Sequence, residues 1–164
     1  MIESYFKRPF LYDYSTAIVV CAIIYYLNRT ERIDLPSAET TISTTTDLAT
    51  IALTLAGFVL TLLTVLITFK TGAKIPNGSN NDNIPLFDIF FSTNLYYKTI
   101  GLLKGCIKSL IFVAVLGFSL KLFVNPPYVK YIFFSNILGL IIIVATLWRS
   151  LLILTNIVNL QKTD

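Results

Sequence analysis

The chain has 164 residues, of which 55% are hydrophobic and 13% are charged, with a mean hydropathy of +0.73 and a net charge of +4. Soluble domains usually carry about a quarter charged residues, so this composition excludes an ordinary soluble globule and also a disordered chain. The sequence contains no histidine, which excludes the usual zinc sites and the nucleophile pairs that depend on histidine. We expect a small membrane protein that is not an enzyme and holds no metal or cofactor.

Four segments are apolar enough to cross a membrane as helices, for which about 20 residues are needed. The predicted spans are at about 9–28, 48–69, 105–124 and 128–148. The first span contains one acid, Asp13, which we interpret as helix-start chemistry after Pro9. The sequence therefore predicts an all-α transmembrane fold, a four-helix polytopic protein that forms a single membrane domain over residues 1–164.

Lysine and arginine are distributed unevenly about these spans. Four crossings place both termini and the cytoplasmic loop 70–98 on one side, and that side holds nine of the 13 Lys and Arg residues. The positive-inside rule then places both termini in the cytoplasm. We expect the protein in a bacterial inner membrane, in contact with its lipids.

The third and fourth spans form a hairpin around the turn at 125–127, and both arms are longer than the membrane is thick. We expect cytoplasmic helical extensions at about 95–108 and 149–161. A short helix along the membrane surface is expected at 86–97, where aromatic residues are frequent.

The second extension has an apolar side, because Ile153, Ile157 and Leu160 recur at helical spacing. This pattern predicts packing against a neighbour. Alternatively, the fourth span runs deeper and the Arg149 side chain reaches the interface by snorkelling. Polar contacts between helices are expected from three asparagines: Asn136, Asn156 and Asn159.

The second span carries a regular line of small polar residues, which we call the threonine stripe. The stripe consists of Thr50, Thr54, Gly57, Thr61, Thr64 and Thr68. Its alternating spacing of four and three follows one face of a helix, and chance gives such a line roughly once in several hundred sequences. Two interpretations remain open. The stripe packs closely against another helix, with each hydroxyl bonded to its own backbone, or it lines water in a channel. A channel requires a homo-oligomer of four or more copies, because one span cannot enclose a pore.

Two acids lie before the stripe, on the outer side of the predicted membrane. Asp47, repeated by symmetry with Glu39 nearby, predicts an acidic outer mouth that attracts cations. The alternative for Asp47 is that it caps the start of the second helix.

Six basic residues are expected near the cytoplasmic surface: Lys70, Lys74, Lys98, Lys104, Lys108 and Arg149. They favour binding to anionic lipid head groups. Alternatively, they form a site for an acidic ligand such as a nucleotide or oligonucleotide, whose bases would stack on nearby aromatic rings. The rings in question are Phe90, Phe91, Tyr96 and Tyr97.

In plan, the chain resembles the small multi-spanning membrane effectors of bacterial anti-phage immune systems, and holin-like proteins share this plan. The resemblance rests on the short length, the four spans, the lack of catalytic residues and the basic, aromatic cytoplasmic segment. It implies permeabilisation of the inner membrane when a cytoplasmic signal changes, often a nucleotide or oligonucleotide. We therefore expect a homo-oligomeric ion channel lined by the threonine stripe and gated from the cytoplasm. The alternative is a non-conducting anchor or accessory subunit that packs against a partner membrane protein.

Overall fold

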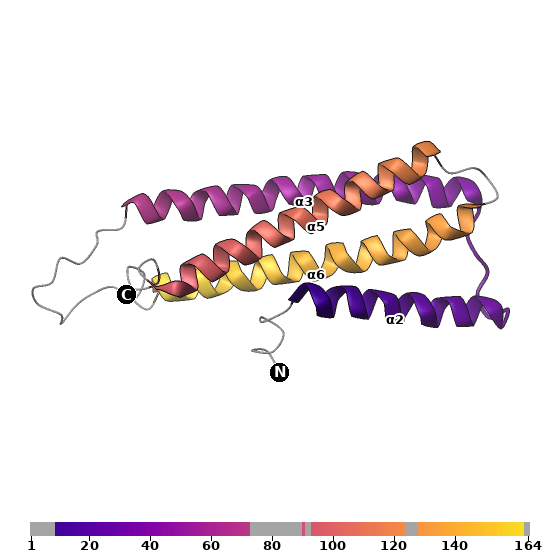
Figure 1. Cartoon of the computed structure of the whole chain (residues 1–164), viewed down its shortest axis with the longest axis horizontal. Helices are drawn as coiled ribbons and strands as arrows, with labels where there is room; N and C mark the ends of the chain where they lie inside the picture. Colours follow the sequence, from indigo (N-terminus) through magenta and orange to yellow (C-terminus); the bar gives the residue numbers. More distant parts are fainter. Residues whose placement is uncertain (1–8, 73–89, 91–92, 124–127, 163–164) are drawn as a thin grey trace, which may run out of the picture.

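The computed structural model describes residues 9–72, 90, 93–123 and 128–162, and all regular structure in these ranges is helical. The chain forms four long helices, and each runs antiparallel to the helix before it (Figure 1). They are α2 (Pro9–Arg29), α3 (Ala38–Gly72), α5 (Asn94–Phe123) and α6 (Val129–Lys162). Each is long and apolar enough to cross a membrane. The predicted all-helical architecture with four apolar helices is therefore confirmed.

Helix α3 begins well before the charge-free segment from which the second span was predicted. Ser37 caps its first turn, because the Thr40 backbone N–H donates to Ser37 Oγ at 3.2 Å. Asp47 is thus several residues inside the helix, and the interpretation of Asp47 as its cap is wrong. In the threonine-rich start of α3, hydroxyls such as that of Thr44 donate to the carbonyl one turn back, here Thr40 O at 2.8 Å, so they are satisfied within the helix itself.

We call the end of the bundle where α2 leads into α3 the turn end, and the opposite end the far end. At the far end α3, α5 and α6 extend beyond α2 (Figure 1). The residues of the predicted extensions, 95–108 and 149–161, are continuous with α5 and α6 rather than separate helices. Of the predicted surface helix at 86–97, residues 94–97 are the first turn of α5, whereas 86–89, 91 and 92 lie outside the described residues, as does most of the 70–98 loop.

Helices α3 and α5 approach closely near the turn end because small residues meet there. A Cβ atom placed on Gly117 of α5 would lie 3.3 Å from Ala49 Cβ and 3.5 Å from the Thr45 carbonyl oxygen of α3. Small residues at a helix interface allow such contact inside a membrane, where packing rather than water exclusion drives association.

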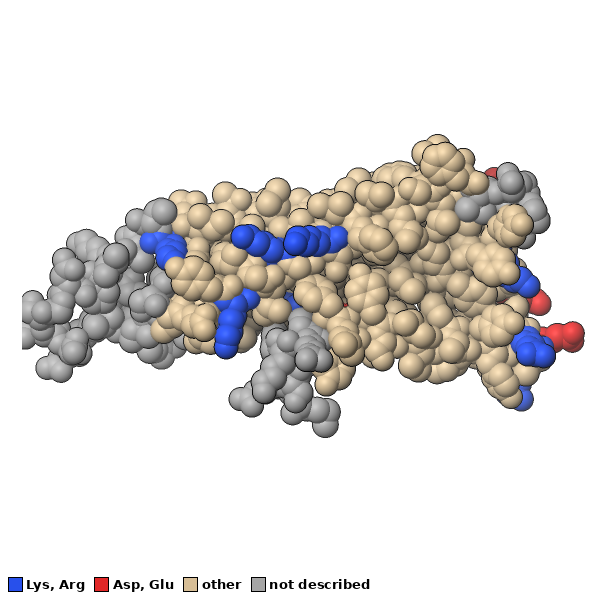
Figure 2. Space-filling model, viewed as in Figure 1, with Lys and Arg blue, Asp and Glu red and all other residues tan. Residues whose placement is uncertain are grey.

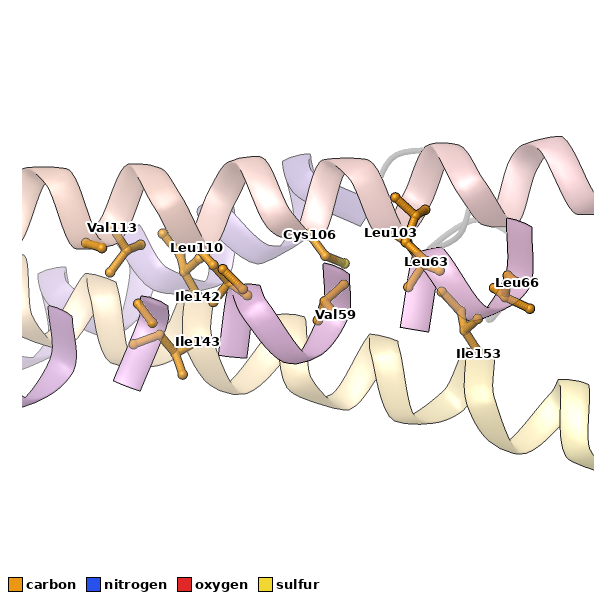
Figure 3. Close-up of a cluster of buried hydrophobic side chains, with 13 residues drawn as sticks. Val59, Leu63, Leu66, Leu103, Cys106, Leu110, Val113, Ile142, Ile143 and Ile153 are labelled. Carbon is orange, nitrogen blue, oxygen red and sulfur yellow. The ribbon is translucent and has the colours of Figure 1, made fainter. Parts of the chain in front are cut away.

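Larger side chains fill the space between α3, α5 and α6 farther along the bundle (Figure 3). Leu63 and Leu66 of α3 and Leu103 of α5 are buried in this cluster. Ile153 of α6 belongs to it and Ile157 packs against it, which is the packing that their spacing predicts. The core therefore continues into the far end, beyond α2.

Helix α2 is the peripheral member of the bundle. It packs mainly against α6, where the rings of Tyr25 and Phe134 lie 5.9 Å apart and the Cys21 thiol donates to the Phe134 carbonyl oxygen at 3.6 Å. Most of its other apolar side chains are exposed. The three-helix unit of α3, α5 and α6 thus forms the core of the described chain.

Candidate functional site

The threonine stripe lies on the face of α3 that points away from α5 and α6. All six stripe positions are exposed. The buried positions of α3, among them Ala52, Ala56 and Val59, occupy the opposite side of the helix. The stripe is therefore not used to pack α3 within its own chain.

Every threonine hydroxyl of the stripe donates to the carbonyl oxygen four residues earlier. The donor-to-acceptor distances are 2.9 Å for Thr50 and Thr54, and 3.0 Å for Thr61, Thr64 and Thr68. Each hydroxyl oxygen keeps acceptor lone pairs for another group. These bonds satisfy the donors without water, so they are compatible with a packed seam and with a hydrated face.

Bulky apolar side chains border the stripe on both sides. The Ile51 edge consists of Ile51, Phe58 and Val65, and the Leu53 edge consists of Leu53, Leu60 and Ile67. Successive members of each edge are seven residues apart. All six are between 42% and 51% exposed, so both edges are equally open along the helix.

The two predicted mouth residues lie on the exposed side of α3 toward the turn end. Glu39 is in the first turn of the helix and Asp47 is about two turns farther on, and both are exposed. Lys121, at the end of α5, donates to the Thr46 hydroxyl at 2.9 Å. This bond brings a positive charge to the same end of α3.

The predicted basic residues separate into different environments. Lys98, Lys104 and Lys108 are exposed on α5, and Figure 2 shows basic side chains on this face toward the far end. Among the described residues, the only acid in that half of the bundle is Asp13, which is buried. Within the described ranges, no exposed carboxylate lies in that half of the bundle to balance the charge of the three lysines. Lys74 lies outside the described residues.

Lys70 is held by aromatic rings. Its ammonium nitrogen donates to the Tyr97 hydroxyl at 2.8 Å and lies 4.4 Å and 4.1 Å from the ring centroids of Tyr96 and Tyr97. Tyr96 is buried and meets the ring of Phe90 edge-on, with the centroids 6.2 Å apart. Lys70 thus joins the end of α3 to the start of α5 by cation–π contacts. Sequence reasoning missed this contact, since it depends on how α3 and α5 approach each other.

The prediction that Arg149 belongs to a basic surface is wrong. Arg149 is fully buried in the middle of α6 and forms an ion pair with Asp13 of α2. Its guanidinium therefore neither snorkels nor reaches a lipid head group or a ligand on the surface. Asp13 is also not in the first turn of α2, so the helix-start interpretation of Asp13 is wrong as well.

The ion pair lies at the same level on both helices. Asp13 is about 24 Å from the turn end of α2 and Arg149 about 30 Å from the turn end of α6, at about 1.5 Å per residue. A charge buried at this depth is costly unless it has a partner. Opposite charges at comparable distances from the turn end, with Asp13 inside the first predicted span and Arg149 directly after the fourth, are the sequence signal that could have revealed this pair.

Three more residues enclose the Arg149 guanidinium. The ring of Phe10 lies over it, with 4.6 Å between the ring centroid and the guanidinium carbon, and Arg149 Nη1 donates to the sulfur of Cys106 at 3.8 Å. Phe10 in turn lies against Gly105 of α5, where any side chain would overlap the ring. Helices α2, α5 and α6 therefore meet at this one point.

A second buried polar contact joins α3 and α6 near the turn end. The Asn136 amide donates to the Thr41 carbonyl oxygen at 3.0 Å, and its carbonyl oxygen accepts from the Thr45 hydroxyl at 3.0 Å. This is the polar contact between helices that was expected of Asn136, whereas Asn156 and Asn159 are exposed. Within the described ranges, no group of three or more His, Cys, Asp or Glu residues could hold a metal ion.

No protein-family model, no curated protein and no solved structure matches this chain. Its function therefore has to be inferred from its own geometry. Among the described residues, the stripe on the exposed face of α3 and the exposed lysines of α5 are features that the packing of the helices does not require.

Proposed function

We propose that this chain is the subunit of a homo-oligomeric ion channel in a bacterial inner membrane, with the threonine stripe of α3 lining the conducting path. The observation that carries the proposal is the position of the stripe, which faces away from the core of its own chain. In a ring of identical chains, such faces can gather around a common axis.

Hydroxyl groups suit this role because they contact water and ions without burying a full charge. Each stripe threonine keeps acceptor lone pairs after donating to its own helix. A lining of this kind, without rings of carbonyls or charges along its length, discriminates weakly among small ions. Asp47 and Glu39 then lie at the outer mouth, where a ring of carboxylates raises the local concentration of cations.

Gating is proposed to come from the cytoplasmic side, through the exposed lysines of α5. Lys98, Lys104 and Lys108 carry positive charge that nearby described acids do not balance, which suits anionic lipid head groups or an acidic ligand. A nucleotide or oligonucleotide is the ligand class proposed by analogy with anti-phage effectors, which the chain resembles in plan. Arg149 has no part in this site because it is buried.

Thr61→Leu is expected to lower ion flux through reconstituted protein by about threefold or more, because a ring of leucines creates a hydrophobic constriction that loses water. The measurement is single-channel recording or ion flux from liposomes, together with the mass of the protein in detergent. The oligomer is expected to remain intact, since Thr61 is exposed in the chain and supports no internal packing.

Two variants serve as controls for this experiment. Thr61→Ser keeps the hydroxyl and is expected to conduct like the parent. Val115→Leu adds the same side chain to an exposed position of α5 and is also expected to conduct like the parent. If Thr61→Leu conducts as well as Val115→Leu, the stripe does not line the path.

The second candidate function is a non-conducting anchor or accessory subunit whose stripe packs against a partner membrane protein. Gly57 favours it, because apart from the adjacent backbone of α3 no atom of the described residues lies within 4 Å of the position its Cβ would occupy. Glycine within a helix costs about 1 kcal/mol relative to alanine, and no contact among the described residues requires it. Close approach of a partner helix would explain its presence. A monomer without flux would support this candidate.

Reversing charge at the α5 lysines is expected to remove the response of the channel to anions. For the parent, we expect flux to change when anionic lipid replaces zwitterionic lipid, or when ATP is added on the far-end side. Lys104→Glu combined with Lys108→Glu is expected to abolish that response. Lys130→Glu, at the exposed turn end, is the matched control and is expected to retain it. A parent whose flux ignores both anions would contradict the proposed gate.

A further inference from the structure

We propose that copies of this chain assemble head to tail, with the Ile51 edge of α3 in one copy packed against the Leu53 edge of α3 in the next. The inference rests on the proposed channel, and it names the surface through which the subunits meet. Helix α3 lies at the border of the described bundle (Figure 1), and both edges are exposed. The occupant of each edge is a second copy of the same chain.

A ring with the stripe toward its axis needs two different surfaces at every contact, because each subunit meets one neighbour on each side. The two edges meet this need. Ile51 and Leu53 differ by two residues, which is about 3 Å along the helix, and the same offset recurs at Phe58 with Leu60. The seven-residue spacing within each edge lets side chains of parallel helices interdigitate. The edges are therefore in register along the whole stripe.

The charges at the turn end are complementary across the same contact. Asp47 is one turn before Ile51 and lies toward the Ile51 edge. Thr46 is seven residues before Leu53 and continues the Leu53 edge, where it accepts the hydrogen bond from Lys121. In the described part of the chain, neither Asp47 nor Lys121 forms an ion pair. Head-to-tail packing brings Asp47 of one copy toward Lys121 of the next.

This charge pair sets the register more than the affinity, because exposed ion pairs add little free energy but select orientation. With Asp47 facing a lysine of the neighbouring copy, Glu39 becomes the acid closest to the axis at the outer mouth. The interface thus assigns different tasks to the two acids. Asp47 aligns the subunits, and Glu39 faces the entering ions.

Disulfide cross-linking in membranes tests this arrangement with the full-length chain. The variant Phe58→Cys/Leu60→Cys is expected to give a ladder of dimers, trimers and larger species after oxidation, all reverting to monomer on reduction. Either single variant alone is expected to remain monomeric, because each thiol faces the opposite edge of the next copy. All variants also carry Cys21→Ser, because Cys21 is a partly exposed free thiol, whereas Cys106 is buried. A mixture of the two single variants is expected to stop at dimers, since each copy then offers one accessible thiol. The double variants Ile51→Cys/Leu53→Cys and Val65→Cys/Ile67→Cys repeat the test at two other positions along α3.

Besides the absence of any ladder, three results would overturn the proposed interface. One is a double variant whose cross-linking stops at the dimer, and another is cross-linking of a single edge variant with itself. The third is a Thr61→Cys variant that links chains more completely than the double variant, which would place the stripe in a two-fold seam. Flux is measured separately on the reduced protein. A ladder without flux keeps the interface and rejects the channel, whereas flux without any ladder rejects the interface alone.

Charge exchange provides an independent measurement of the same contact. Asp47→Lys and Lys121→Asp are each expected to reduce the yield of the ladder in the double-cysteine background, because like charges then face each other. The two reversals together are expected to restore it. A double reversal no better than the single ones would place Asp47 and Lys121 in separate surroundings.

Discussion

Replacing Arg149 with alanine is expected to lower the free energy of unfolding by about 3–5 kcal/mol, because it leaves the Asp13 carboxylate buried without its cation. The loss also includes the contact of the guanidinium with the Phe10 ring. Unfolding by SDS titration in mixed micelles measures it. The fluorescence of Trp148, the only tryptophan of the chain, reports on the unfolding of α6, because this residue directly precedes Arg149 and its side chain is exposed.

The expected loss of unfolding free energy is large because Arg149→Ala leaves the Asp13 charge buried and unpaired. Control variants separate this cause from the loss of packing alone. Asp13→Ala is expected to cost a similar amount. The double variant Asp13→Leu/Arg149→Met is expected to recover most of the stability, since apolar side chains can replace a buried ion pair. Lys108→Ala removes an exposed cation of α5 and is expected to cost about 0.5 kcal/mol or less. Equal costs for Arg149→Ala and Lys108→Ala would mean that the ion pair does not stabilise the fold.

Gly105→Ala is expected to destabilise the chain by up to about 2 kcal/mol, because the usual cost of overfilling a packed site, about 1–3 kcal/mol, is only partly offset by the roughly 1 kcal/mol that alanine gains over glycine in a helix. The new methyl group would overlap the ring of Phe10, which lies against the glycine. The ring also covers the Arg149 guanidinium, so its displacement weakens the contact of α2 with α6 as well as with α5. The same SDS titration provides the measurement.

Gly101, one turn earlier in α5, is the matched control for this substitution. A Cβ atom at Gly101 would have no neighbour within 4 Å, so Gly101→Ala is expected to be neutral or to stabilise the helix by up to about 1 kcal/mol. Adding Phe10→Leu to the Gly105→Ala variant is expected to relieve part of its cost by removing the overlapping ring. Similar stabilities of the two alanine variants would show that Phe10 does not need the space at Gly105.

The helices could be predicted from the sequence because long charge-free segments and turn residues are local signals. The start of α3 could not be placed correctly in this way. The predicted span began at Leu48, after the last charge, whereas Asp47 is tolerated on an exposed helix face and the cap is provided by Ser37. Charge marks the edge of a hydrocarbon layer, but it does not mark the end of a helix.

The buried ion pair was missed because each member had an adequate local explanation. Asp13 follows Pro9 closely enough to look like part of a helix start, and Arg149 ends a charge-free segment as a snorkelling residue would. Pairing between the first and the last helix depends on which helices are neighbours, and this depends on the packing of the whole bundle. The contacts of Lys70 were missed for the same reason, since its aromatic partners are on α5.

The threonine stripe was found from the sequence, but the sequence did not show whether the stripe faces the core of its own chain or points away from it. Periodicity establishes that the threonines share a face, and only the packing of Ala52, Ala56 and Val59 places that face opposite the core. The choice between a hydrated path and a seam depends on contacts between chains, which neither periodicity nor the fold of one chain contains.

The Asp13–Arg149 pair has a consequence for how the chain is made. Helix α2 is synthesised well before α6, and the arginine that neutralises its carboxylate follows more than a hundred residues later. Until α6 is made, the apolar helix α2 carries an acid with no cation beside it. Helix α2 therefore reaches its final position only after α6 is in place, and a chain cut short before Arg149 would lack the charge that holds Asp13 against the bundle.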